Sequence, residues 1–368
     1  MSAVVDAVAD CFAQSYAEAR GKFFAAAEAA GLDVQSHPHP LLGMEGETLA
    51  MDVVRAGPRD APLLLLSSAC HGVEGFCGSG VQVALLRDAA FQAAAREAGV
   101  AVLYVHALNP HGFSWWRRVT QENVDLNRNW HDFSRPLPRN TAYDDIARLL
   151  LPAHWPPGPE ADAALAAWVA QHGARALQTA VTAGQHDHPE GLFYGGRSPT
   201  WSQQTLRHVL QDEGRRCARL AWIDFHTGLG PTGHGERIAA MRDDATGIAR
   251  SRAWWGAQVT SIYDGSSTSA RLTGMMFEAA YQECPQAEYT GIALEYGTEP
   301  MDEITTALRQ DQWFECHPEA DPVLRAAARR RMRDAFYTDT AEWKQRIVAQ
   351  GREAALQAVA GLAGAGRS

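Results

Sequence analysis

Residues 67–75, Ser-Ser-Ala-Cys-His-Gly-Val-Glu-Gly, follow the apolar run 63–66, and the rest of the chain is interpreted from this stretch. The apolar run is short and predicts a buried strand. Just beyond it stand His71 and Glu74, and imidazole and carboxylate groups are both zinc ligands in proteins. The two glycines of the stretch allow the chain to turn there. The stretch therefore predicts two of the three protein ligands that a catalytic zinc ion needs.

The composition is that of a globular protein, since 46% of the 368 residues are hydrophobic and 21% are charged. The formal net charge of −10 argues against nucleic acid or an anionic membrane surface as the main partner. No stretch approaches about 18 uninterrupted apolar residues. Residues 1–30 have neither the basic beginning nor the unbroken apolar segment of a secretory signal. We therefore expect no membrane span and a cytoplasmic location.

The six cysteines lack the paired spacing of a zinc knuckle or of a small disulfide scaffold. Cys70 and Cys77 flank the candidate metal ligands, where a secreted enzyme could hold a disulfide. The alternative is a pair of free, mostly buried thiols, which we favour because no secretory signal is visible.

Hydrophobic patterns predict strands that alternate with helices. A helix is expected over 4–30, and strands are expected over 49–54 and 63–67. Residues 80–98 are expected to form a helix and 100–105 a strand, and such a strand–helix–strand unit favours a parallel sheet with crossover helices. The expected fold class is α/β, with a central mixed, mainly parallel sheet flanked by helices.

The expected organisation is one catalytic domain with an extension at each end. Residues 1–45 are expected to form an N-terminal helical extension, 46–345 the catalytic domain, and 346–368 a C-terminal helical tail. Within the domain, 131–160 is irregular and rich in Pro, Arg and Asp, and helical patterns follow. We interpret 130–215 as an insertion or lid region.

The third zinc ligand is expected to be His226, which ends the strand-like segment 219–225. In open α/β sheets, sites collect beyond the carboxyl ends of the strands. His226 would complete the two-His, one-Glu set of hydrolytic zinc sites. Asp224, two residues earlier on the same strand face, is placed to orient a ligand imidazole.

Amide hydrolysis also needs a general base and groups that stabilise negative charge. Glu295 is a lone carboxylate inside the apolar strand 291–297, where burial raises a carboxyl pKa. Arg117, Arg118 and Arg128 provide cations for an oxyanion and for a substrate carboxylate. Asn127 adds a neutral donor next to them.

These segments occur in the order found in the carboxypeptidase A-like zinc metallopeptidases, which the chain resembles over roughly residues 50–300. The flanking sequence resembles a bacterial branch of that superfamily of unknown function. The matching segments are His71-Gly72-Val73-Glu74, Asn109-Pro110-His111-Gly112, Val124-Asp125-Leu126-Asn127-Arg128-Asn129, the strand-end His226 and the strand Glu295.

The resemblance implies one zinc ion, bound by His71, Glu74 and His226, and Glu295 as the base. It also implies that Asn127 and Arg128 hold the free carboxylate of the substrate.

The resemblance further implies that an arginine just upstream polarises the scissile carbonyl. Arg117 and Arg118 both satisfy this, and Arg118 is preferred because the spacing resembles the aspartoacylase branch. Tyr263 matches the substrate-capping tyrosine of the family by position alone.

We therefore expect a zinc-dependent hydrolase that cleaves an amide bond next to a free carboxylate, as a carboxypeptidase acts on peptides. One alternative is an N-acyl amino acid amidohydrolase similar to aspartoacylase. Another is a non-catalytic binding protein with the same fold. Glu295 and the three ligands argue against the last alternative, because a pure binding protein needs no base.

Overall fold

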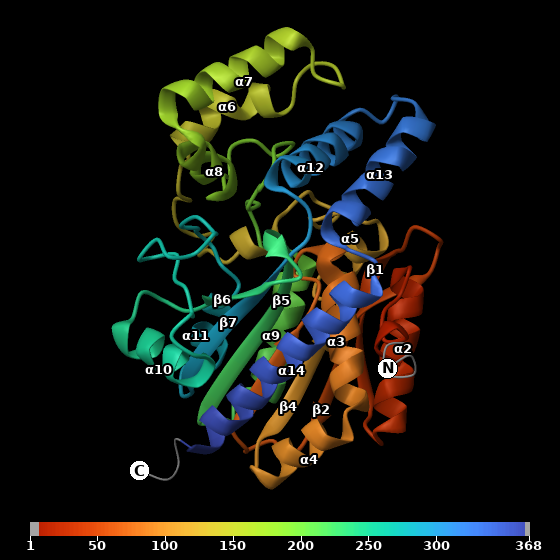
Figure 1. Cartoon of the computed structure of the whole chain (residues 1–368), viewed down its shortest axis with the longest axis vertical. Helices are drawn as coiled ribbons and strands as arrows, with labels where there is room; N and C mark the ends of the chain where they lie inside the picture. Colours follow the sequence, from red (N-terminus) through yellow and green to blue (C-terminus); the bar gives the residue numbers. More distant parts are fainter. Residues whose placement is uncertain (1–6, 365–368) are drawn as a thin grey trace.

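Seven strands form one mixed sheet in the computed structural model, which describes residues 7–364 (Figure 1). The strands are β1 (Val34–Leu42), β2 (Thr48–Ala56), β3 (Leu63–Ser67), β4 (Ala101–His106), β5 (Arg219–Thr232), β6 (Gly235–Ala239) and β7 (Glu288–Gly297). They lie in the order β1-β2-β4-β3-β5-β7-β6. The pairs among β4, β3, β5 and β7 are parallel, and the pairs toward both edges are antiparallel. The expected α/β class with a mixed, mainly parallel sheet is confirmed.

The position of each strand follows from its sequence. β3 and β4 are continuous apolar runs with no exposed residue, which suits strands covered on both faces by crossover helices. β1 carries Pro38 and Pro40 and lies at the edge of the sheet. An edge strand tolerates proline because a missing N–H there breaks no internal ladder.

Helices cover both faces of the sheet and its carboxyl end (Figure 1). One face carries α3, α4 and α14, with α2 packed on α3, and α9 lies against β2 behind the sheet. The helices are α2 (Tyr16–Ala29), α3 (Gly75–Arg87), α4 (Ala89–Glu97), α5 (Pro110–Ser114), α6 (Thr141–Leu150), α7 (Pro159–His172), α8 (Ala174–Thr182), α9 (Trp201–Glu213), α10 (Ala245–Trp255), α11 (Glu278–Glu283), α12 (Met301–Cys316), α13 (Pro322–Phe336) and α14 (Ala341–Gly364).

A second group of helices stands beyond the carboxyl ends of the parallel strands. It comprises α6, α7 and α8 together with α12 and α13 (Figure 1). Their apolar side chains form a hydrophobic cluster distinct from the main core, with Tyr143, Val181, Leu308 and Met332 among its members. The helices α6 to α8 fall within residues 130–215, whereas α9 from the same range packs against the sheet.

The N-terminal extension expected over residues 1–45 is not only helical, because it also contributes the edge strand β1. The helix expected over 4–30 is interrupted: residues 7–9 are helical, residues 10–15 are not, and α2 starts at Tyr16. Ser15 caps it by accepting a hydrogen bond from the Glu18 amide at 3.2 Å. Residues 4–6 lie outside the described part of the chain.

Two further helices differ from their expected bounds. The helix expected over 80–98 is divided at Asp88, whose carboxylate accepts hydrogen bonds from the first amides of α4. Residues 346–364 of the expected C-terminal tail are part of α14, which begins at Ala341 and packs on α3 and β5. Residues 365–368 lie outside the described part of the chain.

Two further expectations concern cysteines and membranes. Cys70 and Cys77 are buried free thiols, so the alternative of free thiols is confirmed. Between residues 7 and 364, no helix combines the length and the apolar character needed to cross a membrane.

Candidate active site

The candidate site lies at the carboxyl edge of the sheet, between β3 and β5. From β3 the chain continues to β4 on one side, while β5 pairs with β3 on the other side. Ligands of open α/β sheets bind in the crevice at such a reversal of strand order. His71 follows β3 and His226 lies within β5, so the topology brings both to the same crevice.

The structure brings His71, Glu74 and His226 together. His71 Nδ1 lies 2.8 Å from Glu74 Oε1. His226 Nδ1 lies 3.3 Å from His71 Nδ1 and 3.1 Å from Glu74 Oε2. All three side chains are buried. Donor atoms this close together are within reach of one ion at zinc–ligand distances of about 2.0–2.2 Å.

The two glycines beside these ligands permit close packing. The positive φ of this turn belongs to Ala69, at 58°. A Cβ on Gly72 would lie 2.1 Å from the carbonyl carbon of Gly112, and one on Gly75 would lie 2.5 Å from the Phe113 ring. The expectation that these glycines supply the turn is therefore corrected, because they let α5 approach the ligand segment.

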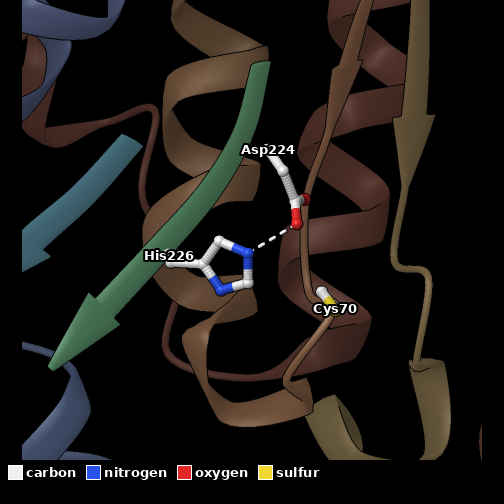
Figure 2. Close-up of side chains that lie close together, drawn as sticks. All are labelled: Cys70, Asp224 and His226. Carbon is white, nitrogen blue, oxygen red and sulfur yellow. Dashed lines mark hydrogen bonds and ion pairs between the residues drawn. The ribbon is translucent and has the colours of Figure 1, made fainter. Parts of the chain in front are cut away.

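An aspartate lies on the far side of each imidazole. His226 Nε2 is 2.5 Å from Asp224 Oδ2 (Figure 2). His71 Nε2 is 3.3 Å from Asp125 Oδ1 and 2.8 Å from Arg118 Nη2. Such carboxylates orient imidazole ligands and leave the other ring nitrogen free for a metal. The sequence predicts this role for Asp224. It offers no comparable signal for Asp125 beyond its place in the Asp-Leu-Asn-Arg-Asn motif.

We expect Asp125→Asn to weaken zinc binding by about 10- to 100-fold. In the wild type, the buried Asp125 carboxylate faces His71 Nε2 and accepts a hydrogen bond from Arg118 Nε at 3.0 Å. The substitution replaces this negative charge with a neutral amide. The measurement is the zinc dissociation constant by competition with a chelator. The control is Asp132→Asn, an exposed acid of the same segment. Equal zinc affinity in the two variants would contradict a role for Asp125.

A second possible ligand set shares His226, since Cys70, Asp224 and His226 also lie close together (Figure 2). Burial, followed by the charges of Asp224 and Asp125, raises the pKa of the Cys70 thiol well above its ordinary value. Metals bind the thiolate, which this environment disfavours. Cys70 is also absent from the lining of the cavity described below. The set with Glu74 is therefore the better candidate.

Glu295 lies beside His226 on the neighbouring strand, because the two residues are direct partners in the β5–β7 register. Its carboxylate is buried and accepts a hydrogen bond from the Leu229 amide at 3.1 Å. Burial, together with the negative charge of Glu74, raises the pKa of Glu295 to about 8, although His226 opposes the shift. A carboxyl group with this pKa is mostly protonated at neutral pH, and a cation bound beside it would favour the carboxylate form that a general base requires.

The neighbouring arginines 117 and 118 point to different places. Arg118 lines the cavity, and its Nη1 donates to Glu74 Oε1 at 3.2 Å. Arg117 donates from Nε to Asp311 at 3.0 Å and from Nη2 to Gln312 at 2.7 Å, both on α12. The structure therefore brings Arg118 into the site. The expectation that Arg117 binds substrate is corrected, because its buried guanidinium anchors α12.

Arg128 is buried at the cavity wall and donates mainly to backbone carbonyl oxygens. Its Nε donates to the carbonyl oxygen of Thr182, and its Nη1 donates to that of Asn127, both at 2.8 Å. Within residues 7–364, the one carboxylate oxygen within 4.0 Å belongs to Asp125, and Nη2 has no hydrogen-bond partner. Burial lowers the pKa of Arg128 to about 10. A buried guanidinium with free donors is suited to bind an anion.

Tyr263 is not brought into the site. Its hydroxyl donates to the carbonyl oxygen of Met241 at 3.1 Å, and Arg271 lies 5.4 Å from the centre of its ring. Tyr263 does not line the cavity, but Tyr289 does, with its hydroxyl bonded to the carbonyl oxygen of Ala240 at 2.8 Å. No sequence motif marks Tyr289, because its position depends on the packing of β7.

One cavity of about 160 Å³ joins these groups. Its polar lining includes the three candidate ligands and Glu295, with Arg118, Asn127 and Arg128 on the same surface. The remaining lining is mostly apolar. A cleft with few convergent polar groups on an apolar wall is typical of a small-molecule site.

Several solved structures are similar to this chain. Carboxypeptidase A from Helicoverpa armigera is 12% identical over 96% of this chain and 75% of its own, with a TM-score of 0.51. A metallo-carboxypeptidase from Burkholderia cenocepacia is 12% identical over 95% of this chain and 68% of its own, with a TM-score of 0.46. An aspartoacylase family protein from Mesorhizobium loti is 15% identical over 72% of this chain and 61% of its own, with a TM-score of 0.39.

The likeness to the Helicoverpa enzyme establishes the fold as carboxypeptidase-like. None of the curated proteins matches the chain. A protein-family model, described as "Protein of unknown function (DUF2817)", matches residues 12–350. The chain therefore belongs to the DUF2817 family and has a carboxypeptidase-like fold.

Proposed function

We propose that the protein is a zinc-dependent hydrolase that cleaves an amide bond next to a free carboxylate. One observation carries this proposal: the donor atoms of His71, Glu74 and His226 lie within 4.8 Å of one another, beside the buried Glu295, in one cavity. Two imidazoles and one carboxylate are the ligand set of hydrolytic zinc enzymes. Peptides and N-acyl amino acids both present the bond to be cleaved.

The residues fit a zinc ion in two respects. Each imidazole has an aspartate at Nε2, and Nδ1 faces the other donors. The three side chains also line the cavity, which leaves space for a fourth position. When bound, zinc supplies a Lewis acid that polarises a carbonyl oxygen and lowers the pKa of water.

Glu295 is proposed as the general base. It faces the cavity beside the ligands, where it would take a proton from the attacking water and pass it to the leaving nitrogen. Its burial in the absence of a cation keeps the pKa near 8. Binding of a cation at the three ligands is expected to lower that pKa again, since a nearby positive charge favours the carboxylate.

Arg118 is proposed to stabilise the negative charge that develops on the carbonyl oxygen. Its guanidinium is held by Glu74 and Asp125, and its carbon lies 4.8 Å from the centre of the Phe193 ring. A donor fixed before the reaction starts costs no reorganisation in the transition state.

Asn127 and Arg128 are proposed to bind the substrate carboxylate. The free Nη2 of Arg128 supports this role, as does the 4.0 Å distance from its Nη1 to Asp125, a carboxylate that also pairs with Arg118, because a carboxylate ligand would supply a closer counter-charge. The alternative is that Arg128 only holds its loop. Asp132, the other acid near Arg128 in sequence, is exposed and pairs with Arg135.

Arg128→Lys is expected to lower kcat/KM for free-acid substrates. The loss of transition-state stabilisation should be about 1–3 kcal/mol, the strength of a charge-assisted hydrogen bond. An ammonium group cannot form the two parallel bonds that a guanidinium forms with a carboxylate. The measurement compares the zinc-loaded wild type and variant on a free acid and on its C-terminal amide.

The amide is the internal control for this variant. The wild type is expected to process it poorly, and Arg128→Lys should hardly change that rate. Equal proportional losses on acid and amide would show that Arg128 only supports the loop. Absence of turnover on all free-carboxylate peptides and N-acyl amino acids would contradict the proposed function itself.

A further inference from the structure

The cavity of the candidate site lies between two separate hydrophobic clusters. Its floor consists of main-core residues, namely Trp222, Ala239, Met276, Phe277, Tyr289 and Ile292. Its roof consists of members of the upper helical cluster, namely Val181, Leu192, Phe193, Ile304, Leu308 and Phe336. A substrate bound here is therefore covered by apolar side chains on two sides.

The proposed carboxylate clamp contacts the floor and one end of the roof. Asn127 Oδ1 accepts a hydrogen bond from the amide of Met276 at 2.9 Å. Arg128 Nε donates to the carbonyl oxygen of Thr182 on α8, and its guanidinium carbon lies 5.6 Å from the centre of the Phe193 ring. The other end of the roof lies beside the candidate ligands, since the carbonyl of Phe336 accepts a hydrogen bond from Thr227, which follows His226. The acyl group of a substrate, across the scissile bond from the clamp, is left to contact this other end, formed by Ile304, Leu308 and Phe336.

The described lining offers no spare carboxylate near the roof. Its acids are Glu74, Asp224 and Glu295. The first two contact the imidazoles of the candidate ligands, and the third is the proposed base. The α-ammonium group of a dipeptide would lie on the acyl side without a counter-charge, and an unpaired buried charge is strongly unfavourable. A neutral acyl group avoids that cost.

The cavity encloses only a short acyl chain. Its whole volume, the clamp included, is about 160 Å³. Along α12 the lining becomes more buried, from 45% exposed at Met301 to 4% at Ile304. The opening therefore lies beside the first turn of α12, and the end of a longer chain would leave the cavity there.

We infer that the substrate is a small N-acyl amino acid whose acyl group is apolar and uncharged and contacts the roof. This inference rests on the proposed function and names its substrate class.

The test compares N-acetyl-, N-butanoyl- and N-hexanoyl-leucine with leucyl-leucine. We expect kcat/KM to rise roughly two- to fourfold for each added methylene that the roof buries. Leucyl-leucine, whose ammonium group would lie without a counter-charge, should fall at least about 100-fold below N-hexanoyl-leucine. Leucyl-leucine cleaved as well as the hexanoyl compound would overturn the inference.

Ile304→Asn places a polar group in the roof and should lower the hexanoyl-to-acetyl ratio of kcat/KM by about tenfold. The ratio does not depend on the fraction of folded enzyme. Thr306→Asn is the matched control, since Thr306 is on the same helix, is partly exposed and does not line the cavity. An unchanged ratio in Ile304→Asn would show that the acyl group does not contact the roof.

Binding to the zinc-loaded Glu295→Gln variant provides a readout without turnover. Calorimetry should give the same order of affinities, with N-hexanoyl-leucine tightest and leucyl-leucine weakest. If the compounds bind in this order but the wild type cleaves none of them, the proposed hydrolysis fails while the roof assignment stands. If the wild type cleaves them without preference for the acyl group, the roof assignment fails.

Discussion

Glu295→Gln is expected to lower the turnover of the zinc-loaded protein by at least about 10²-fold. Glutamine keeps the shape of the side chain and can still accept the hydrogen bond from the Leu229 amide. It cannot take a proton from water at neutral pH. Steady-state kinetics on an N-acyl amino acid measures the loss, and zinc content and substrate affinity should change little.

Glu236→Gln is the matched control for this prediction. Glu236 is the partner of Glu295 in the antiparallel β6–β7 register and is equally buried, at 8% exposed for each. Its carboxylate accepts hydrogen bonds from Thr260 and Thr268 and does not line the cavity. Most of the turnover should therefore survive in Glu236→Gln. Near-normal turnover in Glu295→Gln would remove Glu295 from the mechanism.

Loss of the metal is expected to lower turnover by at least about 10³-fold, because Lewis-acid stabilisation of the transition state amounts to several kcal/mol. Dialysis against a chelator and the variant His226→Ala should both produce this loss. Added zinc should restore the chelated wild type and leave His226→Ala inactive. Turnover is measured on the same N-acyl amino acid, with metal content determined for each sample.

His234→Ala is the control for the ligand variant. His234 lies in the turn between β5 and β6, is exposed and lies outside the cavity lining. This variant should bind zinc and turn over substrate as the wild type does. Full turnover of a sample free of metal would contradict the zinc-dependent mechanism.

The clustering of the candidate ligands could be predicted from the sequence because each group lies at or near a strand end. His71 follows a run of four leucines, and His226 and Glu295 lie in short apolar strands. Parallel strands bring such ends to one edge, so position along the chain predicts position in space. Asp224 could be predicted for the same reason, since residues two apart share a strand face.

Groups that lie in loops could not be assigned in this way. Arg117 and Arg118 are adjacent, and only their contacts distinguish them, since Arg117 reaches α12 and Arg118 reaches Glu74. The role of Asp125 depends on a loop that folds back onto His71. Sequence patterns do not encode such long-range contacts of irregular segments.

The roof of the cavity was also beyond prediction from the sequence. The segment expected to be irregular over 131–160 contains α6, and α12 adds Ile304 and Leu308 from far along the chain. These helices bury apolar residues against one another, and the partner of an amphipathic face cannot be identified from that face alone. The sequence does not predict the edge strand β1, because its two prolines are unusual in strands.

The position of bound zinc tests the central claim most directly. Crystals of the zinc-loaded protein, measured on both sides of the zinc absorption edge, would locate the metal by anomalous scattering. We predict one peak at about 2.0–2.2 Å from His71 Nδ1, His226 Nδ1 and a Glu74 carboxylate oxygen, on the cavity side of these residues. A peak elsewhere, such as between Cys70 and Asp224, or no peak at these three residues at saturating zinc, would contradict the account.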